Sequence, residues 1–225
     1  YSIQENGQPL GSFYGYKVQG IFQSDDAVAA APFQTDVTAA GDIQFVDING
    51  DGKIDDFDSN EAHELYRILG LGALKYFLLK VEPKKRMLFN PEESIDFHGH
   101  TGPFIQYNYA RISSVLRKAK EAGVEIKAEA LQAITQIHPT ERDLIILLSQ
   151  YPSQVKEAGD GYAPSVIAQY VYEVAKAYGR VWSEVSILGE SDAAIKHFRV
   201  ALSQLTAQTI RQGMSLLGIL VPEKM

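Results

Sequence analysis

The spacing of apolar residues changes between residues 58 and 59, and this change constrains the fold more than any other feature of the sequence. Before it, glycines interrupt short aromatic runs and alternating runs, a pattern typical of strands and tight turns. After it, apolar residues recur about every 3.6 positions, which predicts amphipathic helices. Residues 1–58 carry ten Asp or Glu and two Lys or Arg, whereas residues 59–225 carry eighteen and nineteen, so the formal net charge of −7 comes from the first piece. We therefore predict a mainly α protein: a short acidic β-rich segment (1–58) followed by a helical bundle (59–225).

The acidic segment contains a calcium-binding pattern. Residues 11–22 read as short strands and turns, and residues 42–47 alternate like a strand that leads directly into a loop over 47–58. This loop has the ligand spacing of an EF-hand-like calcium site, with Gly52 at the sharp turn. The candidate ligands are Asp47, Asn49, Asp51, the backbone carbonyl of Lys53, Asp55 and Asp58. Because a strand precedes the loop, we expect any calcium to be structural. The alternative is an acidic loop of Asx turns that never holds an ion.

Two motifs in the same segment resemble a known family. Residues 7–23 (GQPLGSFYGYKVQGIFQ) and 41–56 (GDIQFVDINGDGKIDD) are similar to parts of SusC/RagA-like TonB-linked outer-membrane receptors. The resemblance implies that residues 1–58 derive from an outer-membrane protein. It does not imply transport, because a barrel must close to satisfy the backbone groups at its strand edges. A calcium-binding fragment of such a nutrient receptor is the alternative function for this chain.

From residue 59 onward the pattern predicts helices. Ser59 can cap a first helix that Pro83 stops, and a second helix runs to about Ala122. Further amphipathic runs cover about 126–135, 140–149, 163–182 and 192–217. The only candidate strand in this part is 87–89. The run 68–81 is broken by Lys75 and Lys80 and is shorter than the roughly 20 residues of a spanning helix, so we predict no transmembrane helix. The chain begins at Tyr1 without the basic and apolar regions of a signal peptide, so we expect none.

Several short patterns look catalytic, and we interpret each as structural. Gly70 and Gly72 lack the third glycine and the preceding strand of a dinucleotide fingerprint, which favours helix packing. Asp96, His98 and His100 could be three metal ligands, but the sequence offers no fourth ligand, so polar loop groups facing water are the better interpretation. No serine–histidine–aspartate set and no paired carboxylates stand out. The chain has no cysteine, which excludes disulfides and thiolate zinc sites.

Four motifs resemble arginyl-tRNA synthetase. They are residues 68–81 (ILGLGALKYFLLKV), 89–97 (FNPEESIDF), 101–107 (TGPFIQY) with 109–112 (YARI), and 216–225 (LLGILVPEKM). They occur in the family's order. The resemblance implies that 59–100 is the tail of the class I catalytic domain and 101–225 the helical anticodon-binding domain of a cytoplasmic protein. It also implies two partners, an arginine-specific tRNA and the missing catalytic domain.

The catalytic motifs of the family are absent from this chain. In the family, the class I ATP-binding motifs of the His-x-Gly-His and Lys-Met-Ser-Lys types lie upstream of the matching region. Neither His98-Gly-His100 nor Lys85-Arg-Met87 has the required spacing or setting. We therefore expect no ATP site and no arginylation by this polypeptide alone.

Binding of single-stranded RNA needs aromatic or guanidinium planes and scattered cations, which fits the near-neutral helical part. Tyr178 and Trp182 lie four residues apart, the spacing at which two rings share one helix face and could form a stacking platform. The resemblance implies tRNA contacts at Tyr107, Arg111, Tyr178, Trp182 and Met225, with Lys118 and Lys120 as weaker phosphate contacts. The alternatives are ordinary core packing for the aromatic residues and a cap or ion pair for Arg111.

The two resemblances point to different cellular origins. No linker rich in Gly, Ser or Pro separates the two pieces. We therefore interpret the chain as a chimeric fragment, and favour an assembly artefact or an engineered fusion over a natural two-domain protein.

Overall fold

The computed structural model divides the chain into two compact units, residues Tyr1–Arg67 and Ile68–Met225. The residues that it describes are 2–5, 8–12, 35–37, 43–45, 59–82, 84–88, 90–97, 99–124, 134 and 136–225.

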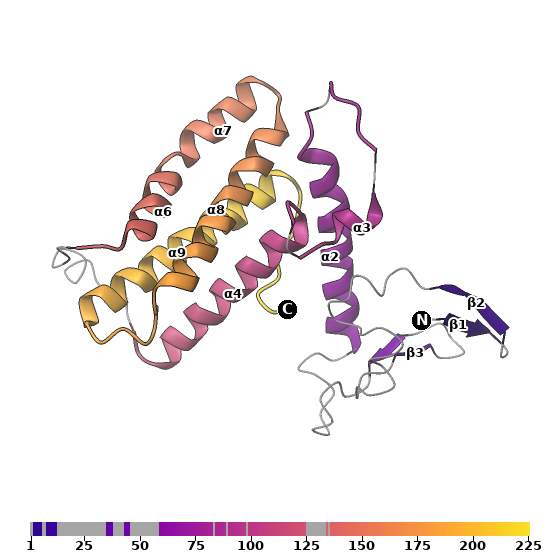
Figure 1. Cartoon of the computed structure of the whole chain (residues 1–225), viewed down its shortest axis with the longest axis horizontal. Coiled ribbons are helices and arrows are strands. Elements are labelled where there is room, and N and C mark those ends of the chain that lie inside the picture. The colour runs from indigo at the N-terminus through magenta and orange to yellow at the C-terminus, as the bar shows by residue number, and fades with distance from the viewer. Residues whose placement is uncertain are drawn as a thin grey trace. The chain divides into compact units, whose positions relative to one another are not determined.

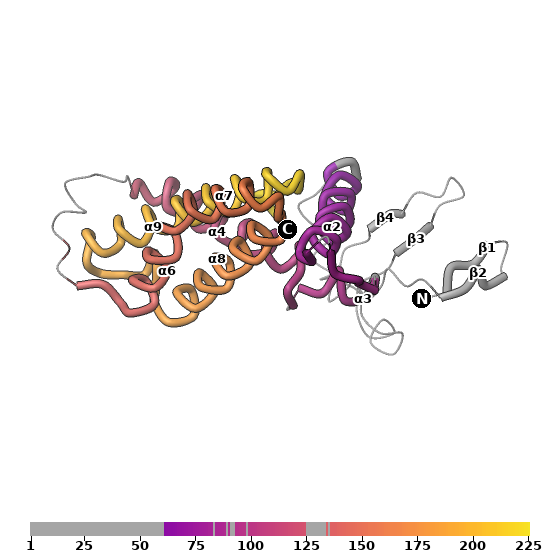
Figure 2. Tube along the Cα trace, turned by 90° about the horizontal axis from the view of Figure 1, so that it is seen from above, coloured from indigo at the N-terminus to yellow at the C-terminus, as the bar shows by residue number. Residues whose placement is uncertain are grey.

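The described residues of the first unit include four short strands, labelled in Figure 2. Strand β1 (Ser2–Glu5) pairs antiparallel with β2 (Gln8–Ser12), and β3 (Thr35–Val37) pairs antiparallel with β4 (Ile43–Phe45). Strand β4 lies inside the alternating run 42–47. The candidate calcium ligands from Asp47 to Asp58 lie outside the described residues, so the calcium loop stays a prediction.

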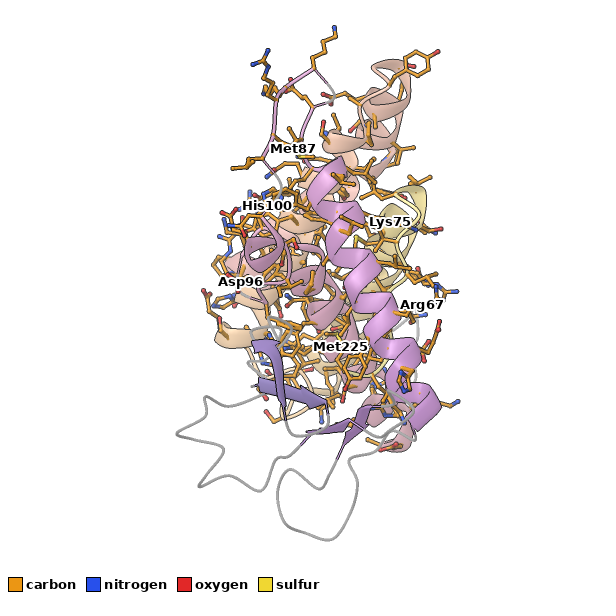
Figure 3. The ribbon with its side chains drawn as sticks, turned by 90° about the vertical axis from the view of Figure 1, so that its right-hand side faces the viewer. Arg67, Lys75, Met87, Asp96, His100 and Met225 are labelled. Carbon is orange, nitrogen blue, oxygen red and sulfur yellow. The ribbon has the colours of Figure 1, made fainter. Side chains whose placement is uncertain are left out.

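Helix α2 (Ser59–Leu79) begins at the residue predicted to cap it and ends before Pro83. Figure 3 looks onto this helix, with Lys75 on one side and Asp96 and His100 on the other. A single turn, α3 (Pro91–Ser94), follows. Met87 and Leu88 form no strand, and Phe89 lies outside the described residues, so the structure does not support the candidate strand at 87–89.

The rest of the second unit is a helical bundle, which confirms the prediction of a mainly helical protein (Figure 1). Helix α8 packs against α4, α6, α7 and α9, and α9 also packs against α4. The helices are α4 (Gly102–Glu121), α6 (Pro139–Ser149), α7 (Tyr151–Asp160), α8 (Pro164–Glu184) and α9 (Ala193–Leu216). Four of them agree with the predicted ranges to within about two residues. The run 126–135 lies almost wholly outside the described residues. Helix α7 was not predicted, because its apolar stripe has only three residues, Tyr151, Val155 and Ala158, which pack partly buried against the core.

Local sequence signals explain where these helices begin. The Thr101 side chain accepts a hydrogen bond from the backbone N–H of Phe104 at the start of α4. His138 and Glu141 form a capping box at the start of α6, and Asp192 accepts from two backbone N–H groups at the start of α9. Prolines occupy the first turn of α4, α6 and α8, where the missing N–H costs nothing.

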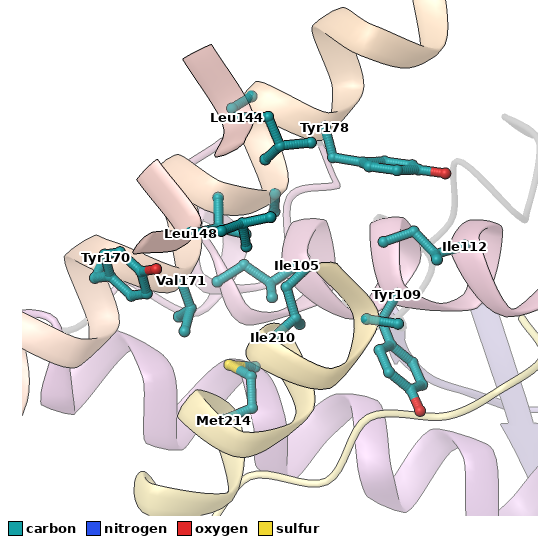
Figure 4. Packing of buried hydrophobic residues seen from close by; sticks show 14 of the residues in the cluster. Ile105, Tyr109, Ile112, Leu144, Leu148, Tyr170, Val171, Tyr178, Ile210 and Met214 are labelled. Carbon is teal, nitrogen blue, oxygen red and sulfur yellow. The ribbon is translucent and has the colours of Figure 1, made fainter. Parts of the chain in front are cut away.

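The core lies between α4, α6, α8 and α9 (Figure 4). Side chains with no or almost no solvent exposure include Ile105, Ile112, Leu144, Val171, Tyr178, Ile210 and Met214. Arg199 on α9 forms two ion pairs. Its Nε lies 2.6 Å from Oε1 of the buried Glu141, which joins α9 to α6, and its Nη1 lies 2.7 Å from Glu190 Oε2.

Helices α2 and α4 approach each other closely at two glycines. A Cβ atom added to Gly102 would lie 2.6 Å from the carbonyl oxygen of Gly72, too close for any real side chain. A Cβ atom added to Gly72 would lie 2.4 Å from Gln106 Nε2, so Gly72 has the predicted packing role, whereas nothing lies within 4 Å of a Cβ atom added to Gly70. Within the part of the chain that the structure describes, no helix is both long and apolar enough to span a bilayer.

Candidate nucleic-acid interface

The guanidinium group of Arg111 lies between two aromatic rings. Its Cζ atom is 4.7 Å from the ring centroid of Tyr107 and 5.3 Å from the ring of Trp182. Tyr107 and Arg111 are one turn apart on α4, whereas Trp182 comes from the last turn of α8. Both distances are within the range of cation–π attraction, so the rings hold the guanidinium plane in place. We call these three residues the Arg111 cluster.

The Arg111 cluster is open to solvent. Tyr107 is 42% exposed and Trp182 is 43% exposed, although large aromatic side chains in a bundle are mostly buried. Each ring therefore offers a partner some of its surface while its remaining area packs on the protein. Exposed ring surface beside a guanidinium suits stacking by unpaired bases.

The predicted platform of Tyr178 and Trp182 is wrong, because Tyr178 is fully buried. Its hydroxyl oxygen lies 3.0 Å from the Ser203 hydroxyl on α9, and Ser203 in turn donates to the Arg199 carbonyl at 2.7 Å. Burial raises the pKa of Tyr178 to about 12. Tyr178 thus follows the core-packing alternative, while Trp182, one turn later and near the end of α8, reaches the surface.

Arg111 is the group that brings Tyr107 and Trp182 together, and this pairing across two helices was not predicted. The contact between Tyr107 and Arg111 has a sequence signal, because the two residues are four apart, the spacing at which side chains meet on a helix. The contact between Arg111 and Trp182 has no such local signal. It depends on α8 packing against α4.

The other predicted contact residues lie on or near α4. Lys118 and Lys120 are exposed along its last turn, where phosphates can reach them. Met225 is partly buried at the end of a tail that follows α9. Figures 1 and 2 both place the end of this tail near α4 and α2.

No metal centre is found among the described residues, which contain no group of three potential ligands. His98 lies outside them. The His100 ring instead packs 4.0 Å from the ring of Tyr172, with Tyr76 edge-on at 5.7 Å. Burial lowers the pKa of His100, and the nearby Lys80 ammonium lowers it further. These contacts describe a histidine packed among aromatic rings rather than one facing water.

Known proteins resemble this chain in the region of the Arg111 cluster. Residues 105–225 match the family model described as the DALR anticodon binding domain. The chain is 52% identical over 174 residues to the arginine–tRNA ligases of Amoebophilus asiaticus and Bacteroides thetaiotaomicron, a match that covers 77% of this chain and 29% of each relative. Among solved structures, Thermus thermophilus arginyl-tRNA synthetase aligns with a TM-score of 0.67 and 33% identity, over 76% of this chain and 28% of that chain. The chain therefore spans less than a third of the length of these relatives.

Proposed function

The chain belongs to the DALR anticodon binding domain family, and on this premise we propose that residues 59–225 are the tRNA-binding portion of an arginine–tRNA ligase. The observation that supports this proposal most directly is the exposed Arg111 cluster, which lies within the matching residues 105–225. A cytoplasmic location for the helical part belongs to the same proposal.

The geometry suggests how an anticodon loop is held. The loop presents unpaired bases, which stack on the exposed faces of Tyr107 and Trp182. Arg111 is already ordered between the two rings, so little side-chain entropy is lost when it binds a base or phosphate. Lys118 and Lys120, further along α4, provide charge for the adjacent backbone. The helical part needs no strongly basic surface, because stacking supplies much of the affinity.

A titration of the full chain with labelled tRNA tests this proposal by fluorescence anisotropy. We expect tighter binding to an arginine tRNA than to an unrelated tRNA, and about tenfold weaker binding for Trp182→Ala, which removes one stacking surface. Tyr162→Ala is the matched control, because Tyr162 is also an exposed aromatic residue but lies outside the Arg111 cluster. Equal affinity for both tRNAs, or equal losses in the two variants, would refute the proposal.

We further propose that this chain does not arginylate tRNA alone and that its partner is the remaining, ATP-binding part of the ligase. One face of α2 supports this proposal: Leu71, Leu74 and Leu78 recur at helical spacing and are each 40–45% exposed. A contiguous exposed apolar face marks an interaction surface more often than a free one.

The partner proposal is tested by mixing the full chain with the rest of the Bacteroides thetaiotaomicron ligase, expressed separately. We expect a complex by size-exclusion chromatography that Leu74→Glu disrupts. Leu205→Glu is the control, because Leu205 is an exposed leucine on α9. A complex that survives Leu74→Glu, or no complex with the unsubstituted chain, would contradict it.

For residues 1–58 we propose a second function, structural calcium binding by a fragment of receptor origin. The support is the spacing of oxygen ligands from Asp47 to Asp58 within a segment of strong negative charge. Calorimetry with and without a chelator tests it, because an ion that binds only the folded state raises the unfolding temperature of the segment that holds it. Calcium should raise this temperature, and Asp51→Asn should weaken the effect. An unchanged thermogram would refute the calcium site.

A further inference from the structure

One buried amide group joins three segments that are far apart in the sequence. Gln106 on α4 has no solvent exposure, and its Nε2 donates to the carbonyl of Ile68 on α2 at 3.2 Å. The same Nε2 donates to the carbonyl of Leu220, in the tail after α9, at 2.8 Å. Both amide protons are therefore used, one on each neighbouring segment.

The close approach of this amide to α2 depends on Gly72. A Cβ atom at position 72 would lie 2.4 Å from Gln106 Nε2, so any larger residue would displace the amide. Seven residues after Ile68, on the same side of α2, Lys75 makes a second contact with the tail. Its Nζ donates to the carbonyl of Gly218 at 2.6 Å.

The tail is held both by hydrogen bonds to its backbone carbonyls and by the buried side chain of Ile219. Gly218 adopts a left-handed conformation (φ 66°) that ends α9 and turns the chain, and Ile219 is buried. The Leu220 side chain is 59% exposed, although its carbonyl is bonded to Gln106. The contacts of Gln106 and Lys75 thus fix the path of the backbone that leads to Met225.

Gln106 directly precedes Tyr107 of the Arg111 cluster. The turn of α4 that presents the exposed Tyr107 ring therefore also anchors the tail. We propose that Gln106 and Lys75 are positioning residues that hold residues 222–225 in register with the Arg111 cluster, so that both contact the same RNA loop. The RNA half of this inference rests on the proposed function above.

A readout that needs no RNA tests whether these residues hold the tail. The chain has three methionines, and Met214 is buried in the core, so methyl-labelled methionine reports the tail and the core separately by NMR. In Gln106→Leu and Lys75→Leu, we expect the Met225 methyl signal to sharpen and move toward its free-peptide position while the Met214 signal stays. Lys75 is exposed, so Lys75→Leu keeps the test valid if Gln106→Leu does not fold. Lys75→Arg retains a donor and should restore the Met225 signal.

The RNA readout is the affinity of the same variants for arginine tRNA. We expect a loss of about fivefold for Gln106→Leu and for Lys75→Leu, the size of one hydrogen bond, and recovery in Lys75→Arg. In a chain that ends at Val221, neither substitution should weaken binding further, because the residues that they position are gone. A purely structural role, or a direct contact of Lys75 with RNA, would still lower the affinity of the shortened chain.

The outcomes separate the two halves of the inference. An unchanged Met225 signal in both variants overturns the anchoring role, whatever the RNA affinities are. Equal losses of affinity in the full and shortened chains overturn the positioning role. If the unsubstituted chain does not bind arginine tRNA, the proposed function and the RNA half fail together, while the Met225 signal alone decides whether the anchor exists.

Discussion

Replacing Tyr178 with phenylalanine should lower stability without affecting RNA binding. The substitution keeps the buried ring and removes only the hydroxyl group, which lies 3.0 Å from Ser203 Oγ. Ser203 keeps its own bond to the Arg199 carbonyl, so its hydroxyl proton does not lose its acceptor. The loss should therefore be that of one ordinary hydrogen bond, about 1 kcal/mol. For a chain of this size, the melting temperature should fall by about 2–4 °C.

Trp182→Ala should instead weaken RNA binding. Trp182 is 43% exposed, so its removal should cost less stability than the roughly 3–5 kcal/mol of a tryptophan in the core. Its loss should weaken tRNA binding about tenfold, because one stacking surface is removed. Thermal unfolding followed by circular dichroism and tRNA titration by anisotropy measure the two effects on the same samples.

The reasoning depends on Trp182→Ala, and not Tyr178→Phe, weakening tRNA binding. If Tyr178→Phe weakened tRNA binding about tenfold and left the melting temperature unchanged, the assignment of Tyr178 to the core would be wrong. If Trp182→Ala lowered the melting temperature more than Tyr178→Phe and left tRNA affinity intact, the Arg111 cluster would be a packing feature.

Three further predictions follow from the buried contacts. Glu141→Gln breaks the buried pair with Arg199 and should cost about 3 kcal/mol in urea unfolding, a loss that an exposed pair would not show. Gly102→Ala forces a Cβ against the backbone of Gly72 and should destabilise the protein by at least about 1 kcal/mol, so an unchanged urea midpoint would contradict the close approach. Burial lowers the pKa of His100 in the folded state, so the folded protein favours the neutral ring. The stability that depends on the neutral ring is complete above pH about 6.5 and is lost as the pH falls through the folded pKa. His100→Gln should therefore lose less stability than the unsubstituted chain between pH 7.5 and 5.5, as measured by urea unfolding.

Local patterns predicted most of the helices because helix formation depends on spacing that a short window contains. Helices α4, α8 and α9 each have an apolar stripe at a period of 3.6, and side-chain caps such as Thr101 and Asp192 mark where two of them begin. Helix α7 has only a three-residue stripe, Tyr151, Val155 and Ala158, which is a weak signal in a short window. The calcium loop remains a prediction from spacing, since its residues lie outside those that the structure describes.

The sequence by itself determined the class of the bundle, the resemblance to a tRNA-binding family, and the four-residue spacing that puts Tyr107 and Arg111 on one helix face. Only the tertiary structure decided that Tyr178 is buried while Trp182 is exposed and joins Arg111. The two aromatic residues occupy nearly the same face of α8, so helical spacing cannot distinguish them. Tyr178 packs inside the bundle and its hydroxyl meets Ser203 on α9, whereas Trp182 lies in the last turn of α8 and is 43% exposed. Which helix packs there is a property of the whole fold, and no local window of sequence contains it.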